Sequence, residues 1–166
     1  TRNTTEDITV NVTDVNETSP VITSSSTFSA AENQTAVGTA TATDADTSDT
    51  LTYTLTGTDA ASFSINASSG VITFNSAPDY ETKSSYTATV TASDGTNTTT
   101  QDITVNVTNV NDNAPAFTSS ATLSAAENQT AIGPVTATDA DSGDSVTFSV
   151  SGSELAITPG GVLSFV

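Results

Sequence analysis

A repeat of 95 residues constrains the fold of this chain more than any other sequence feature. Asp7–Asp14 recurs as Asp102–Asn109 with only the last residue changed, and Ser29–Ala36 recurs unchanged as Ser124–Ala131, in each case 95 residues later. Segments that keep a single period indicate a tandem array of one structural unit. Two shorter matches keep the same spacing: Thr43–Asp46 with Thr138–Asp141, and Pro20 with Pro115.

The repeat divides the 166 residues into three predicted parts. Residues 1–18 are predicted to be the last strand of a preceding repeat, 19–113 a complete repeat, and 114–166 an incomplete following one. Gly161–Phe165 aligns with Gly70–Phe74, so the third part has no counterpart of Pro78–Val107.

Within the complete repeat, apolar and polar residues alternate with a period of two. Leu51, Tyr53 and Leu55 alternate with threonines, and residues 86–93 follow the same pattern. This period is typical of strands with one buried face, and clusters of Gly, Asn and Asp between the strands predict turns. About seven short strands with no helical stretch predict an all-β chain of tandem antiparallel Greek-key β-sandwiches.

The charge of the chain excludes several classes of function. Two basic residues stand against 19 acidic ones, for a net charge of −17. Nucleic acids and anionic membrane surfaces would repel such a chain, and no apolar run is long enough for membrane insertion. The chain has no Cys and no His, so it lacks disulfides and the most common general base and zinc ligand.

The acidic excess has two interpretations. Carboxylates could form a well-solvated surface, or they could surround divalent cations that neutralise their repulsion. The positions of the carboxylates favour cations. Asp44 and Asp46 follow one predicted strand and Asp94 ends another, so these side chains should meet at one end of the sandwich.

A second group of acids, Glu32, Asp79 and Glu81, lies near strand starts and should gather at the opposite end of the repeat. In a stack of repeats, the oxygen-rich segment Asn109–Asn113 would lie between the two ends. Ca²⁺ prefers such hard oxygen ligands. Paired carboxylates also serve glycosidases, but the chain has no Trp and only three Tyr to line a sugar cleft, so we expect no enzyme.

Five motifs in this order resemble the cadherin repeat, and in particular the cadherin-like repeats of long microbial surface proteins. The motifs are Ala31–Asn33, Asp44–Asp46, Asp79–Glu81, Ala92–Gly95 and Asn111–Pro115. The resemblance implies a sandwich of the cadherin/immunoglobulin-like type, an extracellular location, and Ca²⁺ bound at the junctions between repeats.

The resemblance also implies the calcium ligands. At the junction after the complete repeat these are Glu32, Asp79, Glu81, Asn109, Asn111, Asp112, Asn113, Asp139 and Asp141; at the junction before it they are Asp14, Asn16, Glu17, Asp44, Asp46 and Asp94. Two departures leave the number of ions per junction open. Asn109 stands where the family usually has Asp, and Glu17-Thr18 replaces an Asp-Asn pair.

The sequence therefore predicts a calcium-binding structural repeat of a long extracellular adhesin or filament, whose partners are neighbouring repeats of the same chain or of like molecules. The alternative is a module that binds a cell-surface glycan or protein through a strand edge or its Thr-rich face.

A third hypothesis concerns strand exchange between molecules. Residues 5–13 of one molecule could join residues 116–166 of another. The joined domain would still lack a strand matching Tyr86–Ser93, so an excerpt of a longer chain is the preferred interpretation.

Overall fold

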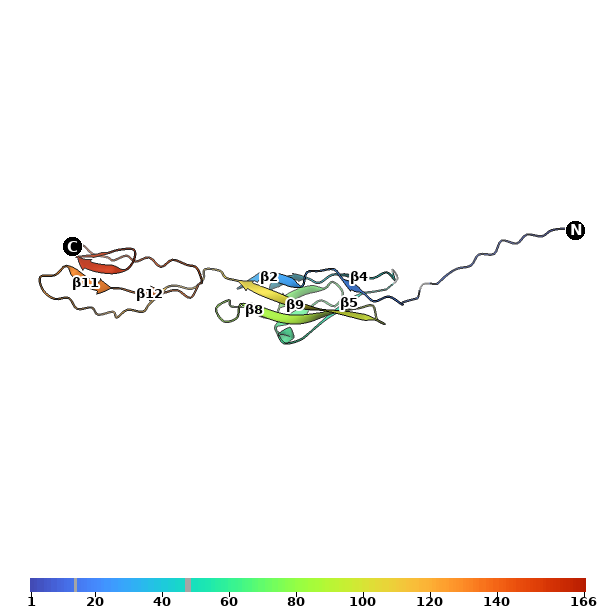
Figure 1. The fold of residues 1–166 in the computed structure, drawn as a ribbon, viewed down its shortest axis with the longest axis horizontal. Helices are drawn as coiled ribbons and strands as arrows, with labels where there is room; N and C mark the ends of the chain where they lie inside the picture. The colour runs from blue at the N-terminus through green and yellow to red at the C-terminus, as the bar shows by residue number, and fades with distance from the viewer. Residues whose placement is uncertain (14, 47–48) are drawn as a thin grey trace. The chain divides into compact units, whose positions relative to one another are not determined.

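The computed structural model describes residues 1–13, 15–46 and 49–166. The chain forms two compact units (Figure 1). Unit 1 comprises Thr1–Asp79 and Lys83–Thr108, and unit 2 comprises Tyr80–Thr82 and Asn109–Val166. Among the described residues, no helix is long and apolar enough to cross a membrane.

Unit 1 is built from strands with one short 3₁₀ turn. The elements are β1 (Val21–Ile22), β2 (Thr27–Ala31), β3 (Ala36–Thr39), β4 (Ala42–Thr43), β5 (Thr52–Thr56), the turn η1 (Ala60–Ser62), β6 (Phe63–Ile65), β7 (Val71–Phe74), β8 (Ser85–Ser93) and β9 (Thr98–Thr108). One sheet has the order β2-β9-β8-β5, a second has the order β3-β7-β6, and β1 pairs with β4. The expected all-β fold is confirmed.

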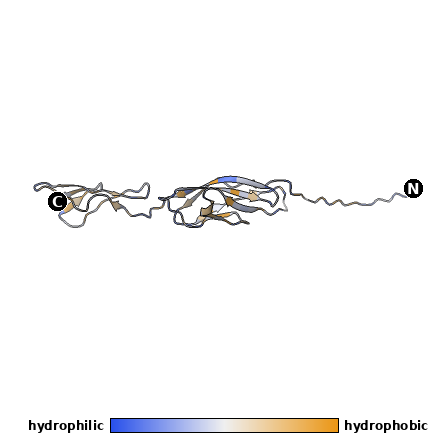
Figure 2. Cartoon of the chain, turned by 90° about the horizontal axis from the view of Figure 1, so that it is seen from below, coloured by the Kyte–Doolittle hydropathy of each residue, from blue (hydrophilic) through white to orange (hydrophobic). Residues whose placement is uncertain are grey.

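The core of unit 1 lies between these two sheets. Alternation along β8 and β9 turns Val90, Ala92, Ile103 and Val105 inward, and each is at most 2% exposed. From the other sheet, the Phe74 ring of β7 packs against the Tyr86 ring of β8 at a centroid distance of 5.0 Å. Figure 2 shows the apolar residues concentrated in the strands of this unit. Threonines of the same strands lie on the solvent-facing side of the sheet, which suits β-branched polar residues.

One strand pairing differs from the antiparallel prediction. β2 runs parallel to β9, in a register that extends from Thr27 opposite Thr104 to Ala31 opposite Thr108. The other pairs described in unit 1 are antiparallel. Residue alternation has the same period in both arrangements, so the sequence pattern alone could not distinguish them.

A glycine in each unit permits a close backbone contact. Gly70 has φ +70°, and a Cβ at this position would lie 2.1 Å from the carbonyl oxygen of Ala40. Its counterpart Gly161 has φ +85° and would place a Cβ 2.2 Å from the carbonyl oxygen of Val135. Glycine tolerates a positive φ and has no Cβ, so it meets both requirements. The same contact therefore precedes β7 in unit 1 and β14 in unit 2.

Unit 2 has fewer strands. These are β10 (Ala116–Phe117), β11 (Ala131–Pro134), β12 (Ala137–Thr138), β13 (Leu155–Ile157) and β14 (Val162–Phe165). They form a sheet of order β11-β14-β13 and a separate β10-β12 pair. Residues 122–126 and 147–151 correspond by the 95-residue period to β2 and β5, but they form no strand. In unit 1 their counterparts pair with β9 and β8, respectively.

Residues 1–13 form no strand, although their sequence alternates as that of β9 does. No described strand pairs with them, and Ile8, Val10 and Val12 are 82%, 78% and 91% exposed. The assignment of residues 1–18 to a preceding repeat, and the boundaries at 19–113 and 114–166, stay predictions.

Candidate metal centres

The first candidate centre lies at one end of unit 1, around Asp46. This side chain is 7% exposed. Its Oδ2 atom accepts hydrogen bonds from the Glu17 amide at 3.0 Å, the Thr18 amide at 2.8 Å and the Thr18 hydroxyl at 2.7 Å. The amide and hydroxyl of Thr18 hold the pKa of Asp46 below its ordinary value, although burial and the nearby charge of Asp94 act in the opposite direction. These hydrogen bonds therefore favour the ionised form of the carboxylate and fix its position.

Asp94 lies close to Asp46 at the end of β8. Its Oδ1 accepts hydrogen bonds from the amides of Thr96 at 2.7 Å and Asn97 at 2.6 Å, which closes a tight turn. Burial raises the pKa of Asp94, but the hydrogen bonds from Asn97 and Thr96 outweigh it and leave the pKa lowered. Asn97 also donates to Asn16 Oδ1 at 2.9 Å, so this turn fixes a residue that was predicted as a ligand.

Asp44 provides a free acceptor at this end of unit 1. Its Oδ1 accepts a hydrogen bond from the Asp46 amide at 3.0 Å. Its Oδ2 is buried and has no hydrogen-bond partner among the described residues. A buried acceptor without a donor is costly unless a cation or water satisfies it. The donor set of Asn16, Asp44, Asp46 and Asp94 consists of hard oxygens, which fits Ca²⁺.

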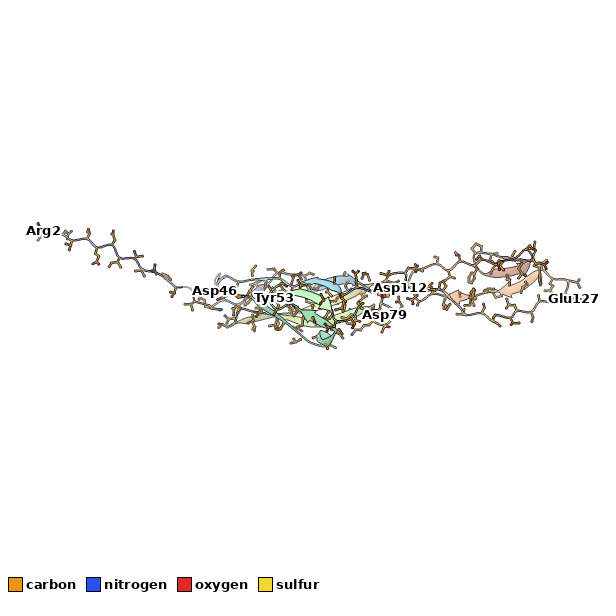
Figure 3. All side chains as sticks on the ribbon, turned by 180° about the vertical axis from the view of Figure 1, so that it is seen from behind. Arg2, Asp46, Tyr53, Asp79, Asp112 and Glu127 are labelled. Carbon is orange, nitrogen blue, oxygen red and sulfur yellow. The ribbon has the colours of Figure 1, made fainter. Side chains whose placement is uncertain are left out.

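The opposite end of unit 1 carries Glu32 and Asp79. Glu32 is 3% exposed, and its amide donates to the Thr108 carbonyl at 3.1 Å. The next amide, that of Asn33, donates to the Pro78 carbonyl at 3.0 Å, which brings the Glu32 segment beside the Asp79 segment. Figure 3 shows Asp46 and Asp79 at opposite ends of this unit, as the sequence predicted for the two groups of acids.

The second candidate centre lies in unit 2 and repeats the arrangement around Asp46. Asp141 is 3% exposed, and its Oδ2 accepts hydrogen bonds from the amides of Asp112 at 3.1 Å and Asn113 at 2.8 Å. Asn113 Nδ2 donates to Asp141 Oδ1 at 3.0 Å. This side-chain hydrogen bond, together with the two amides, lowers the pKa of Asp141 despite its burial.

Further oxygens gather in the second centre. Glu81 and Asp112 offer carboxylate oxygens within 4.8 Å of each other. Asp139 Oδ1 accepts a hydrogen bond from the Asp141 amide at 3.0 Å, as Asp44 does from Asp46. Asn109 donates to the Ser142 carbonyl at 3.2 Å, and its Oδ1 is buried with no partner among the described residues.

The remaining predicted ligands differ in what the structure shows of them. Asn111 is exposed, and Glu17 contributes a backbone amide while its side chain is exposed. Asp14 lies outside the described residues. Sequence reasoning missed Thr18 and Asn97, which hold Asp46 and Asn16 in place. The motif Ala92–Gly95 was recognised in the sequence, but the nearby Asn97 carried no distinguishing signal.

These observations define a class of module: a β-sandwich repeat with carboxylates at both ends. The family model described as "Cadherin domain" matches residues 26–108, which is half of the chain. The chain belongs to the cadherin domain family. Cadherin domains are extracellular and non-enzymatic, which confirms the expected location and the expectation that the chain is no enzyme.

Proteins similar in sequence are large animal cadherins. Mouse Cadherin EGF LAG seven-pass G-type receptor 1 is 34% identical over 148 residues, which cover 82% of this chain and 5% of that protein. The Drosophila Protocadherin-like wing polarity protein stan is 39% identical over 133 residues, covering 71% of this chain and 4% of that protein. The narrower likeness to microbial surface proteins finds no support in these relatives.

Solved cadherin structures share the fold. Human Protocadherin-24 EC1-2 superposes with a TM-score of 0.77 at 24% identity and covers 88% of this chain and 76% of that one. The Protocadherin gammaB7 EC3-6 cis-dimer gives a TM-score of 0.78 at 26% identity and covers 93% of this chain and 45% of that one. Both contain tandem cadherin domains, which agrees with the repeat in this sequence.

Proposed function

We propose that this chain is a calcium-binding structural repeat of a long extracellular adhesin or filament, in which calcium rigidifies the junctions between repeats. One observation carries the proposal. The same carboxylate arrangement occurs twice, at Asp46 and at Asp141, and each has a buried oxygen without a partner beside it, Asp44 Oδ2 or Asn109 Oδ1. A bound cation would satisfy these oxygens and offset the repulsion between the carboxylates.

The proposed ligands follow the two arrangements. Asp44, Asp46, Asp94 and Asn16 would hold calcium at the first centre, with Asp14 and Glu17 as further ligands. Glu81, Asn109, Asn111, Asp112, Asn113, Asp139 and Asp141 would hold it at the second, and Glu32 and Asp79 are proposed as calcium ligands at their own end of unit 1. The family relationship and the side chains described above support this assignment.

Calcium binding would stabilise the folded chain by mass action. Extracellular modules bind Ca²⁺ with a Kd of about 10⁻⁴ to 10⁻³ M. At a free concentration of ten to a hundred times Kd, each site adds about 1.4 to 2.7 kcal/mol to the free energy of unfolding. Because the proposed ligands include linker residues such as Asn16 and Asp112, a bound ion would restrict motion of the linker.

Calorimetric titration with CaCl₂ tests the proposal. The unaltered chain should bind calcium. Asp44→Asn should weaken binding, because it removes the negative charge of the carboxylate that carries the unsatisfied oxygen. Asp7→Asn is the matched control: it makes the same charge change in the exposed segment 1–13 and should leave binding unchanged. Equal titration curves for Asp44→Asn and the unaltered chain would count against the first centre.

Small-angle scattering tests the rigidifying effect. Removal of calcium with EDTA should change the radius of gyration and the distribution of interatomic distances. The linkers would lose their cation, and their carboxylates would repel one another. Identical scattering in EDTA and in calcium would leave a calcium-binding repeat without a mechanical role.

One feature favours the alternative function as a glycan- or protein-binding module. The outer face of the four-stranded sheet aligns hydroxyl groups across three strands, as in the row of Thr54, Thr91 and Thr100. A hollow of about 290 Å³ on this unit is lined by Gly57, Thr87 and Asp102, among others. Retention on insoluble polysaccharides, lost when Thr91 and Thr100 are both changed to Ala, would support this alternative.

A further inference from the structure

The turn between β6 and β7 carries an Asn-x-Ser triplet, Asn66-Ala67-Ser68. Such a triplet, with any residue but proline in the middle, is the acceptor sequence for N-linked glycans on the surface of secreted proteins. Cadherin domains are extracellular, so the chain meets that condition. We propose that the side-chain nitrogen Nδ2 of Asn66 is a glycosylation site and carries an oligosaccharide.

The sequence alone does not select this triplet. Other triplets of the same kind begin at Asn3, Asn11, Asn16, Asn33, Asn97, Asn106 and Asn128. What distinguishes Asn66 is the set of hydrogen bonds that its side chain makes and the atom that they leave free.

The Asn66 side chain is held by its oxygen atom. Its Oδ1 accepts hydrogen bonds from the Ser68 amide at 3.1 Å, the Ser68 hydroxyl at 2.9 Å and the Ser69 amide at 3.0 Å. This is an Asx turn to which the hydroxyl of the same triplet is added. Nδ2, the atom that would carry the sugar, makes no hydrogen bond with any described residue, and residues 66–69 are all exposed.

This arrangement suits the transfer of a glycan to the amide. The hydroxyl that donates to Oδ1 draws electron density from the amide and makes its N–H more acidic, while Nδ2 stays open to a glycan donor. In the transfer, Nδ2 attacks the anomeric carbon of an oligosaccharide linked to a polyprenyl diphosphate. A nitrogen–carbon bond forms, the bond from that carbon to the diphosphate oxygen breaks, and the diphosphate leaves with the electron pair. A base of the transferase takes one amide proton, and nothing is oxidised or reduced.

Two other triplets of unit 1 lack these features. Asn97 Nδ2 donates to the Thr18 carbonyl at 3.0 Å, so its nitrogen is already engaged at the first candidate centre. Asn106 lies within β9, where residues i and i+2 are about 6.6 Å apart along the strand. The hydroxyl of its triplet, that of Thr108, instead donates to the Ala30 carbonyl at 3.4 Å. The triplet in the turn is therefore the better acceptor.

The fold itself does not require asparagine in this turn. In unit 2, Thr158 follows β13 as Asn66 follows β6. The Thr158 carbonyl accepts a hydrogen bond from the Gly161 amide at 2.9 Å, as the Asn66 carbonyl does from the Gly70 amide at 2.8 Å. The acceptor triplet of unit 1 is thus an addition to a turn that also forms without it.

Site mapping of the unaltered chain tests the proposal directly. The full chain is secreted from cultured animal cells behind a cleavable leader. After denaturation, a peptide N-glycosidase releases the glycans in heavy-oxygen water, which leaves a labelled Asp at each occupied Asn. Peptide mass spectrometry should find Asn66 labelled in most molecules, Asn106 in few and Asn97 in none. An unlabelled Asn66, or labelling of Asn66 that does not exceed that of Asn97 and Asn106, would overturn the proposal.

Four variants test the geometry of the turn through the intact mass of the secreted chain. Asn66→Asp keeps the Oδ1 acceptor but removes Nδ2, and Ser68→Ala removes the hydroxyl, so both should lose one glycan. Ser68→Thr restores a hydroxyl and should keep the glycan. Ser69→Ala is the matched control, because it retains the backbone amide that donates to Oδ1. The same glycan mass on all four variants would refute the assignment. Glycosylation of Asn66 does not depend on calcium, so this outcome is independent of the calcium titration above.

Discussion

Two segments with one sequence have opposite environments in this molecule. Asp7–Thr13 and Asp102–Thr108 are identical, yet Val10 is 78% exposed and Val105 is fully buried. The second segment lies between β2 and β8, and no described strand flanks the first. Local preference for extended backbone is the same in both, so burial and strand pairing come from the neighbours. This agrees with the view that β-propensity mainly measures fit to a pleated, half-buried surface.

Units 1 and 2 repeat this comparison on a larger scale. Phe74 and Phe165 are counterparts, and they are 4% and 45% exposed. Thr122–Ala126, the counterpart of β2, has no strand partner among the described residues and no strand conformation. The burial of this phenylalanine therefore depends on the strands that pack around it and not on the motif in which it lies.

The largest expected effect comes from placing the same charge in the two identical segments. Val105→Asp would bury an unpaired carboxylate and should destabilise unit 1 by about 4 kcal/mol or more. Val10→Asp, in the exposed copy, should change the free energy of unfolding by less than about 0.5 kcal/mol. Urea unfolding followed by tyrosine fluorescence compares them, since Tyr53 and Tyr86 both report on unit 1. Comparable destabilisation by the two variants would show that residues 1–13 are packed in solution.

Calcium removal should give the next largest effect. Under saturating calcium the chain should be more stable than in EDTA by about 1.4 to 2.7 kcal/mol per occupied site. The melting temperature should therefore fall on chelation, as measured by calorimetry. Asp44→Asn should reduce this difference, and Asp7→Asn should not. A difference between calcium and EDTA that is unaffected by Asp44→Asn would place the stabilising ion elsewhere.

A single hydroxyl sharpens the comparison between units. Tyr53 accepts a hydrogen bond from the Ala42 amide at 3.0 Å, and Phe148 stands at the equivalent position of unit 2. Tyr53→Phe gives unit 1 the residue that unit 2 has at this position. It should lower the free energy of unfolding by about 1 kcal/mol, because the Ala42 amide loses its acceptor. The far-UV circular dichroism spectrum should stay unchanged while the urea midpoint falls. An unchanged midpoint would mean that water replaces the hydroxyl at no cost.

The smallest effect concerns pH. Hydrogen bonds from the Lys83 side chain and the Thr87 amide lower the pKa of Asp59 in the folded chain. This contribution to stability is present above the ordinary Asp pKa of about 3.9 and is lost as pH falls through the lower, folded pKa. At acid pH the free energy of unfolding should fall less for Asp59→Asn than for the unaltered chain. Asp7→Asn should show the same fall as the unaltered chain. Unfolding curves measured between neutral and acid pH would distinguish the two.

Much of the fold could be predicted from the sequence. The alternation of Leu51, Tyr53 and Leu55 and the 95-residue period predicted sandwich repeats, and the acids at strand ends predicted that Asp46 and Asp79 would lie at opposite ends of one unit. These predictions succeeded because period-two alternation and the position of a residue relative to a strand end are local properties of the chain.

Other features depend on contacts between distant segments. Sequence alternation does not distinguish parallel from antiparallel neighbours, so the pairing of β2 with β9 was not foreseen. The roles of Thr18 and Asn97 were also missed, because each acts on a residue 28 or more positions away. The assignment of residues 1–18 to the last strand of a preceding repeat stays a prediction, because a strand needs neighbouring strands to pair with.

The parallel pairing of β2 and β9 has a mechanical consequence. A force that pulls the beginning of β2 and the end of β9 in opposite directions acts along both strands. The pairs from Thr27–Thr104 to Ala31–Thr108 are then loaded together in shear, whereas a hairpin pulled at its open end separates one pair at a time. A tether assembled from such units would yield abruptly at high tension rather than lengthen gradually under small loads.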